Sequence, residues 1–221
     1  MFKTNKLNTL VAVYIFCIAV SELMGAKTFA LMQIGSFHLN ASVAIFVIPL
    51  LFAINDIVTE VYGKERARSI IRSGMLVIFL LFIFSIIAVM LPASNRFLST
   101  ESAYDEIFQK SARMSLASLI AFGAADFLDV YIFSRIREKL GKRNLWLRTN
   151  VSNFISQFVD TSLFIALAFY APDLSFINNF SFLLGLILPY WLLKCFMSVI
   201  ETPFVYLGTK WLGYGGEEVA K

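Results

Sequence analysis

One run of this chain, residues 73 to 91, reads SGMLVIFLLFIFSIIAVML and carries no charged side chain. A helix crosses the hydrocarbon core of a bilayer, roughly 30 Å thick, with about 20 mostly apolar residues. The rest of the chain is also too apolar for water: 58% of its residues are hydrophobic and 15% charged, against roughly 45–50% and about 25% in soluble domains. The sequence therefore predicts an integral membrane protein.

Six segments are long and apolar enough to span the membrane, some with internal charges. The predicted spans are residues 9–30, 41–60, 73–91, 114–133, 151–170 and 182–207. Pro49 interrupts the second span, which we expect to be kinked, and residues 100–114 predict a short surface helix in an external connection. Because the loops are short, residues 1–221 form one domain, an all-α bundle of six transmembrane helices.

The basic residues predict the orientation of this bundle. Most Lys and Arg residues lie on the side that carries both termini, above all in segments 64–72 and 135–148. Cytoplasmic loops of membrane proteins are enriched in these residues, so both termini are expected in the cytoplasm. The net charge of +4 comes from residues beside apolar segments, which argues against a nucleic-acid partner.

Charged side chains inside the predicted spans are the main indications of function. Such a residue costs about 2.5–3.5 kcal/mol at a helix centre, so it usually faces the bundle interior or a wet cavity. The set is Glu22, Lys27, Asp56, Glu60, Asp126, Asp129, Asp160, Lys194 and Glu201. Acids outnumber bases, so some carboxylates must be protonated, water-exposed or available to a ligand that is cationic or donates hydrogen bonds.

Four polar residues fall nearest the predicted midplane: Glu22, Gln157, Asp160 and Lys194. Lys194 requires an acidic partner, and Asp160, at similar depth, is the predicted one. This pair either fixes two helices together or breaks and reforms during transport, and both interpretations stay open. Gln157 and its polar neighbours indicate that the fifth span lines a wet cavity.

Two pairs of acids lie toward the predicted cytoplasmic ends of their spans. Asp56 and Glu60 are four residues apart, and Asp126 and Asp129 are three apart, so each pair shares one helical face. Basic residues follow each pair. The acids either latch helix ends through Arg66, Arg68, Arg135 or Arg137, or belong to a gate or substrate path; Lys27 is assigned to the same gating or helix-pairing group.

Five aromatic residues lie near the midplane polar residues and are candidates to stack on a flat ligand: Tyr14, Phe154, Phe158, Tyr190 and Trp191. By contrast, the motifs of nucleotide hydrolysis, zinc proteases and serine hydrolases are missing. The two Cys residues lie in apolar runs without metal-ligand spacing. The sequence thus predicts a protein that is not an enzyme, with no catalytic residue, metal or cofactor. An intramembrane aspartyl protease is the remaining enzymatic alternative.

The segment of residues 55–68, NDIVTEVYGKERAR, resembles a motif of the queuosine precursor transporter family, also called the vitamin uptake transporter family. The resemblance extends over almost the whole chain. It includes Lys27, Pro49, Asp129, Asp160-Thr161, and Lys194 before Pro203. One departure is Glu22, because the family has an uncharged, amide-like residue at this position.

The resemblance implies a six-helix importer in the bacterial inner membrane, working by alternating access. It implies uptake of 7-cyano-7-deazaguanine or 7-aminomethyl-7-deazaguanine, precursors of queuosine in tRNA. Carboxylates can accept hydrogen bonds from the N–H edge of such a base. The expected substrate-binding residues are Glu22, Asn55, Asp56, Gln157, Asp160, Lys194, Glu201, Tyr14, Phe158 and Trp191.

Two rival functions stay open at this point. One is a vitamin-binding membrane component that needs a separate energising module, and the other is a membrane assembly protein that transports nothing. The expected partners are the small-molecule substrate and the lipid bilayer. The oligomeric state, with a homodimer as one option, the preferred deazaguanine and the coupling ion are also left open by the sequence.

Overall fold

The computed structural model describes residues 5–35, 37–140 and 145–212. The side chains of some residues in these ranges, among them Asp126, Asp129 and Glu201, lie outside the description. The elements in chain order are α1 (Lys6–Met24), β1 (Thr28–Ile34), β2 (Phe37–Ser42), the 3-10 helix η1 (Val43–Phe46), α2 (Ile48–Tyr62), α3 (Lys64–Met90), α4 (Glu101–Leu140), α5 (Leu145–Phe169) and α6 (Phe176–Leu212).

The chain is a mainly helical membrane protein. Within the described residues, four helical segments are long and apolar enough to cross a membrane: Lys6–Met24, Val43–Tyr62, Glu65–Met90 and Phe176–Phe196. A shorter apolar helix covers Phe154–Phe169. The predicted membrane-protein class is confirmed, while six spans and the cytoplasmic location of both termini stay predictions.

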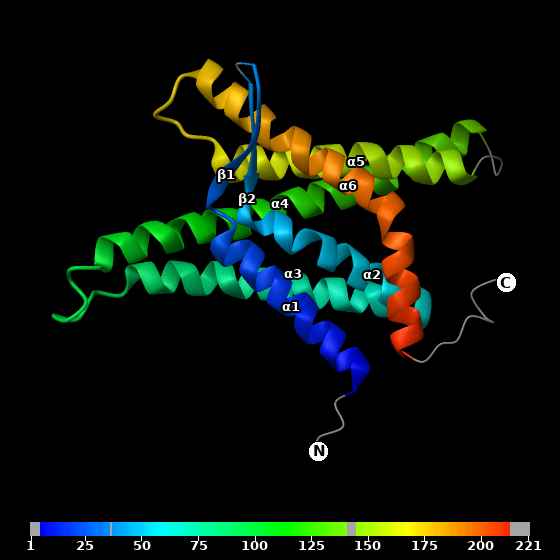
Figure 1. The fold of residues 1–221 in the computed structure, drawn as a ribbon, viewed down its shortest axis with the longest axis horizontal. Helices are drawn as coiled ribbons and strands as arrows, with labels where there is room; N and C mark the ends of the chain where they lie inside the picture. The colour runs from blue at the N-terminus through cyan, green and yellow to red at the C-terminus, as the bar shows by residue number, and fades with distance from the viewer. Residues whose placement is uncertain (1–4, 36, 141–144, 213–221) are drawn as a thin grey trace.

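The helices pack in two sets. In Figure 1, α3, α4 and α5 run along the long axis of the molecule, and α1 and α2 cross them obliquely. Helix α4 packs against both α3 and α5, and α6 packs against α2 and α5. A core of buried side chains joins the first three helices: Tyr14 and Ile18 of α1, Ile54 and Val58 of α2, and Ala67 and Ile70 of α3.

An antiparallel hairpin replaces the end of the first predicted span and the start of the second. Helix α1 ends at Met24, and β1 pairs with β2 from Thr28–Ser42 to Ile34–Phe37. The prediction of helix at residues 25–30 and 41–42 was therefore wrong. Hydropathy alone does not distinguish a short apolar strand from a helix, and the β-branched and aromatic residues here favour a strand.

The expected kink at Pro49 stays a prediction, and the second span is divided just before this residue, because the 3-10 helix η1 ends at Phe46. Helix α2 begins at Ile48, which places Pro49 in its first turn. The first N–H groups of a helix have no intrahelical acceptor, so proline is tolerated there without a break in hydrogen bonding. Pro49 is therefore compatible with the first turn of α2.

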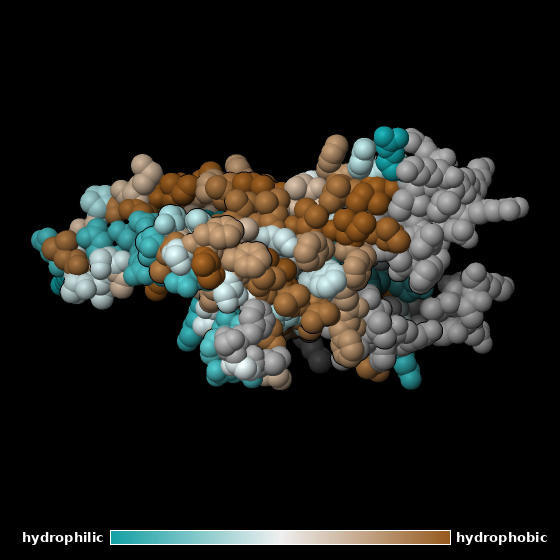
Figure 2. Space-filling view, turned by 90° about the horizontal axis from the view of Figure 1, so that it is seen from above, coloured by the Kyte–Doolittle hydropathy of each residue, from teal (hydrophilic) through white to brown (hydrophobic). Residues whose placement is uncertain are grey.

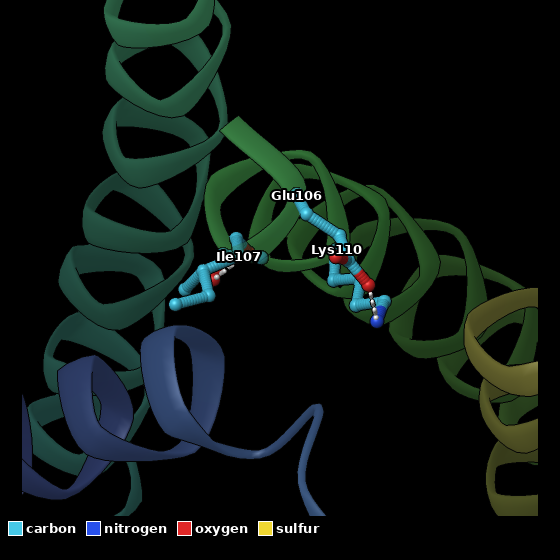
Figure 3. A network of polar contacts seen from close by, with 4 residues as sticks. Glu106, Ile107 and Lys110 are labelled. Carbon is cyan, nitrogen blue, oxygen red and sulfur yellow. Dashed lines mark hydrogen bonds and ion pairs between the residues drawn. The ribbon is translucent and has the colours of Figure 1, made fainter. Parts of the chain in front are cut away.

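The predicted surface helix before the fourth span is not a separate element, because residues 101–140 form the single helix α4. Its first turns carry exposed charges. Lys110 Nζ donates to Glu106 Oε1 at 2.6 Å, and Figure 3 shows the two side chains facing each other. This hydrogen bond and the positive charge of Lys110 lower the pKa of the Glu106 carboxyl group. At the next residue, Ser111 Oγ donates to Leu23 O at 3.1 Å and so joins α4 to α1.

Large apolar side chains cover much of the outer surface. On α3, Leu76, Phe84 and Met90 are exposed, and Figure 2 shows brown hydrophobic residues over much of the visible face. Soluble monomers rarely expose contiguous apolar patches of this kind. The surface is therefore suited to contact with lipid.

The first and last described helices meet at one end of the bundle. Lys6 Nζ donates to the backbone oxygen of Trp211 and lies 5.5 Å from the centre of its ring. This contact places the start of α1 beside the end of α6. The location of both termini in the cytoplasm stays a prediction.

Candidate functional site

A cavity of about 260 Å³ lies among the helices, and all six α-helices contribute residues to its lining. Most of the wall is apolar, including Ile18, Leu51, Phe52 and Ile165. Ligand pockets commonly measure about 300–1,000 Å³ and combine apolar walls with a few polar groups. The size of this cavity is thus suited to a small ligand.

Glu22, in the last turn of α1, is the most deeply buried acid in the described lining. Its exposed fraction is 5%. Ser118 Oγ of α4 donates to Glu22 Oε1 at 2.8 Å, whereas Glu22 Oε2 has no hydrogen-bond partner among the described residues. A neutral hydroxyl group cannot offset the cost of burying a negative charge. Glu22 lines the cavity, and its carboxyl group keeps one buried oxygen without a hydrogen-bond partner among the described residues.

Asp160 of α5 and Lys194 of α6 form an ion pair in the same wall. Lys194 Nζ donates to Asp160 Oδ2 at 2.6 Å, and the side chains are 15% and 28% exposed, respectively. The pairing predicted from depth along the two helices is confirmed. Because the two opposite charges compensate each other, the pair adds no net charge to the cavity.

Two more polar groups in the lining are available to a ligand. Asn55 Oδ1 of α2 and Thr161 Oγ1 of α5 are buried and have no hydrogen-bond partner among the described residues. The Tyr14 hydroxyl lies beside the Asn55 side chain, and its ring forms part of the wall. An unsatisfied buried polar group costs about 1–3 kcal/mol, so these atoms are expected to bind ligand or water.

Five of the predicted substrate-binding residues thus meet at the cavity: Glu22, Asn55, Asp160, Lys194 and Tyr14. Four others do not belong to its lining: Asp56, Gln157, Phe158 and Trp191. Asp56 is exposed. The Trp191 ring centre instead lies 5.3 Å from that of Phe158 and 4.7 Å from that of Phe154, in an aromatic cluster between α5 and α6.

The structure describes the predicted gating residues only in part. The side chains of Asp126 and Asp129, and that of the predicted substrate contact Glu201, lie outside the described residues. Glu60 and Lys27 are exposed. Arg68 pairs with Glu65 at 2.9 Å, and in the described part of the chain no ion pair joins Asp56 or Glu60 to Arg66 or Arg68.

Sequence reasoning missed Ser118 and the link between the hairpin and α6. A signal for Ser118 was present, because Ser111, Ser115 and Ser118 recur at helical spacing and small residues permit close helix packing. The link between the hairpin and α6 joins residues that are far apart in the sequence. Tyr190 Oη accepts from Ser42 N at 3.1 Å and donates to Ser42 O at 3.0 Å, at the edge of the cavity.

Residues 42–208 match a model of the family described as "Putative vitamin uptake transporter". The match covers most of the chain and includes both partners of the Asp160–Lys194 pair. The chain belongs to this transporter family. The matched segment also contains the 55–68 motif from which the resemblance was inferred.

Three curated relatives of this chain are named as transporters. The chain is 31% identical over 179 residues to a "Probable queuosine precursor transporter" of Bacillus subtilis, covering 79% of this chain and 74% of the relative. A protein of the same name from Haemophilus influenzae is 27% identical over 175 residues, or 79% and 70% of the two chains. The "Queuosine precursor transporter" of Escherichia coli is 30% identical over 129 residues, or 58% and 55%. No solved structure matches the chain.

One residue of the transporter-family motif has a clear backbone role. Gly63, between α2 and α3, has φ +81° and ψ 164°. Only glycine adopts this region readily, because a Cβ atom would clash with the backbone there. The motif thus contains the point at which the chain turns from α2 into α3.

Proposed function

We propose that this transporter-family member imports the queuosine precursors 7-cyano-7-deazaguanine and 7-aminomethyl-7-deazaguanine. The observation that carries the proposal is a small, mainly apolar cavity whose lining includes Glu22 and Asn55. Glu22 Oε2 and Asn55 Oδ1 are acceptors with no partner in the described part of the chain. A deazaguanine has a ring N–H and an exocyclic amine on one edge, and it needs acceptors of this kind. The names of the relatives support the same class of substrate.

The residues of the cavity divide into three roles in this proposal. Asn55 accepts a hydrogen bond from the N–H edge of the base, and Glu22 accepts one from another N–H group of the substrate. Lys194, while paired with Asp160, has further ammonium protons to donate to the carbonyl oxygen of the base. Tyr14 supplies an aromatic wall against the flat ring.

The other predicted residues belong to the access path in this proposal. Substrate contacts outside the cavity lining are assigned to Asp56, Gln157, Phe158, Trp191 and Glu201. Gating or helix pairing is assigned to Glu60, Asp126, Asp129 and Lys27. The helices rock around the site so that it opens alternately to each side of the bacterial inner membrane. The chain binds and moves its substrate without chemical change.

The test measures queuosine in tRNA from bacterial cells that neither make the precursors nor have their own importer. At low external precursor, cells with this chain should restore queuosine, and cells without it should not. Asp160→Asn should reduce restoration because it removes the charge that pairs with Lys194. Asp173→Asn makes the same substitution at an exposed residue and is the matched control.

A chain that inserts correctly but restores no queuosine would refute this function. The family description names vitamin uptake, and one alternative is a vitamin-binding component that works with a separate energising module. Restoration by this chain alone argues against that alternative. Thermal stabilisation of the purified chain by a deazaguanine argues against a membrane assembly protein, because a ligand stabilises the folded state that binds it.

A further inference from the structure

We propose that Glu22 makes the cavity select a positively charged ligand, so that this chain prefers the aminomethyl deazaguanine to the neutral cyano form. The inference rests on the proposed function and adds a preference and the residue responsible for it. It starts from the charges that line the cavity.

The charged groups in the described lining are Glu22, Asp160 and Lys194, so acids exceed bases by one. Lys194 is already committed to Asp160 at 2.6 Å. Glu22 accepts a hydrogen bond from the neutral Ser118 hydroxyl, and none of the described ion pairs includes it. With all three groups ionised, the cavity carries one uncompensated negative charge at Glu22.

A buried charge without a counter-charge is strongly destabilising, and a partner of opposite sign removes much of this cost. Glu22 is 5% exposed, so water offers little compensation. A ligand ammonium group would supply the missing positive charge. The aminomethyl substituent is a primary amine, which is protonated at neutral pH as a Lys side chain is, whereas the cyano group carries no charge.

The Ser118 hydrogen bond also orients the carboxylate. It occupies Oε1 and leaves Oε2 as the oxygen to which none of the described side chains donates. Charge-assisted hydrogen bonds from ammonium to carboxylate are about twice as strong as neutral ones. The neutral acceptor Asn55 Oδ1 in the same lining remains available for an N–H group of the ring.

The experiment measures the dissociation constants of both deazaguanines with the purified full-length chain. We expect the wild type to bind the aminomethyl form at least about tenfold more tightly, the range of a hydrogen bond to a charged group. Glu22→Gln keeps an acceptor for Ser118 but removes the charge. It should weaken aminomethyl binding by about tenfold or more and change cyano binding by less than about threefold.

Glu106→Gln is the matched control, because it makes the same change at an exposed acid outside the cavity lining. It should retain the preference for the aminomethyl form. A second measurement needs no variant: wild-type protein should bind 7-hydroxymethyl-7-deazaguanine, a neutral ligand of nearly the same size, about tenfold more weakly than the aminomethyl form.

The outcomes separate this inference from the proposed function. If folded wild type binds neither precursor, the proposed function fails and the inference fails with it. If it binds both equally, or if Glu22→Gln weakens both alike, the charge preference is refuted and the transporter function stands. If Glu22→Gln does not fold, the hydroxymethyl comparison decides: equal binding of the two ligands refutes the preference.

Discussion

The Tyr190 hydroxyl bonds to both backbone groups of Ser42, at 3.1 Å from the nitrogen and 3.0 Å from the oxygen. A single α6 side chain thereby holds the base of the β-hairpin, while Tyr190 and Ser42 both line the cavity. Ser42 Oγ also donates to Gly25 O at the end of α1. The hairpin is thus fastened to two helices beside the proposed substrate site.

Removing this hydroxyl group should loosen the hairpin. Tyr190→Phe leaves the buried N–H and C=O groups of Ser42 without their side-chain partner, at a cost of about 1–3 kcal/mol. We expect faster amide hydrogen exchange at residues 37–42 and a lower unfolding temperature in detergent. Tyr170→Phe, at an exposed site, should leave both unchanged. Unaltered exchange in Tyr190→Phe would show that the hydroxyl does not hold the hairpin.

The Asp160–Lys194 pair predicts a double-mutant effect. Asp160→Asn leaves the mostly buried Lys194 ammonium without a charged partner, which typically costs about 3–5 kcal/mol in a buried pair. Adding Lys194→Met removes the stranded charge and should recover most of the stability. Thermal unfolding of both single variants and the double variant measures the coupling. Additive losses would contradict an energetic link between the two side chains.

Any side chain at Gly63 should destabilise the protein. Its φ of +81° and ψ of 164° belong to a region that costs other residues about 1–3 kcal/mol. We therefore expect Gly63→Ala to lower the free energy of unfolding by that amount. Gly123→Ala is a control with the opposite expected sign. Apart from its chain neighbours and the adjacent helix backbone, no atom of the described residues lies within 4 Å of the added Cβ, and alanine favours a helix by about 0.5–1 kcal/mol. Equal effects at the two sites would refute this explanation.

Gly74 permits α1 to approach α3 closely. A Cβ atom at this position would lie 2.6 Å from Ile18 Cδ1 and 3.0 Å from Tyr14 Cε1. Gly74→Leu should therefore separate the helices and destabilise the protein by about 1–3 kcal/mol, the usual cost of overpacking. It should also weaken binding of both deazaguanines, because Tyr14 lines the cavity.

Ser73→Leu, next to Gly74 but exposed, is the control for added bulk. It should change neither the unfolding temperature nor the dissociation constants. If Gly74→Leu behaves in the same way as Ser73→Leu, the close contact between α1 and α3 is not important for stability or for the site.

The sequence alone determined the membrane class, because an uncharged apolar run such as 73–91 is unfavourable in water whatever surrounds it. It also identified the Asp160–Lys194 pair, because a charge inside a membrane helix needs an opposite charge at similar depth. Five residues that the sequence predicts to bind substrate, among them Glu22 and Asn55, meet at one cavity. These predictions follow from the cost of placing polar groups in an apolar environment, which depends on residue type and spacing.

Only the tertiary structure decided which helical faces meet. Helix packing placed Ser118 beside Glu22 and directed Trp191 toward Phe154 and Phe158 instead of into the cavity lining. The hairpin likewise depends on pairing between β1 and β2 and on Tyr190, which is 148 residues from Ser42. Hydropathy is a property of each segment by itself, whereas these contacts arise from the relative rotation of segments distant in the chain. The sequence therefore predicted which polar groups need partners, and the fold selected the partners.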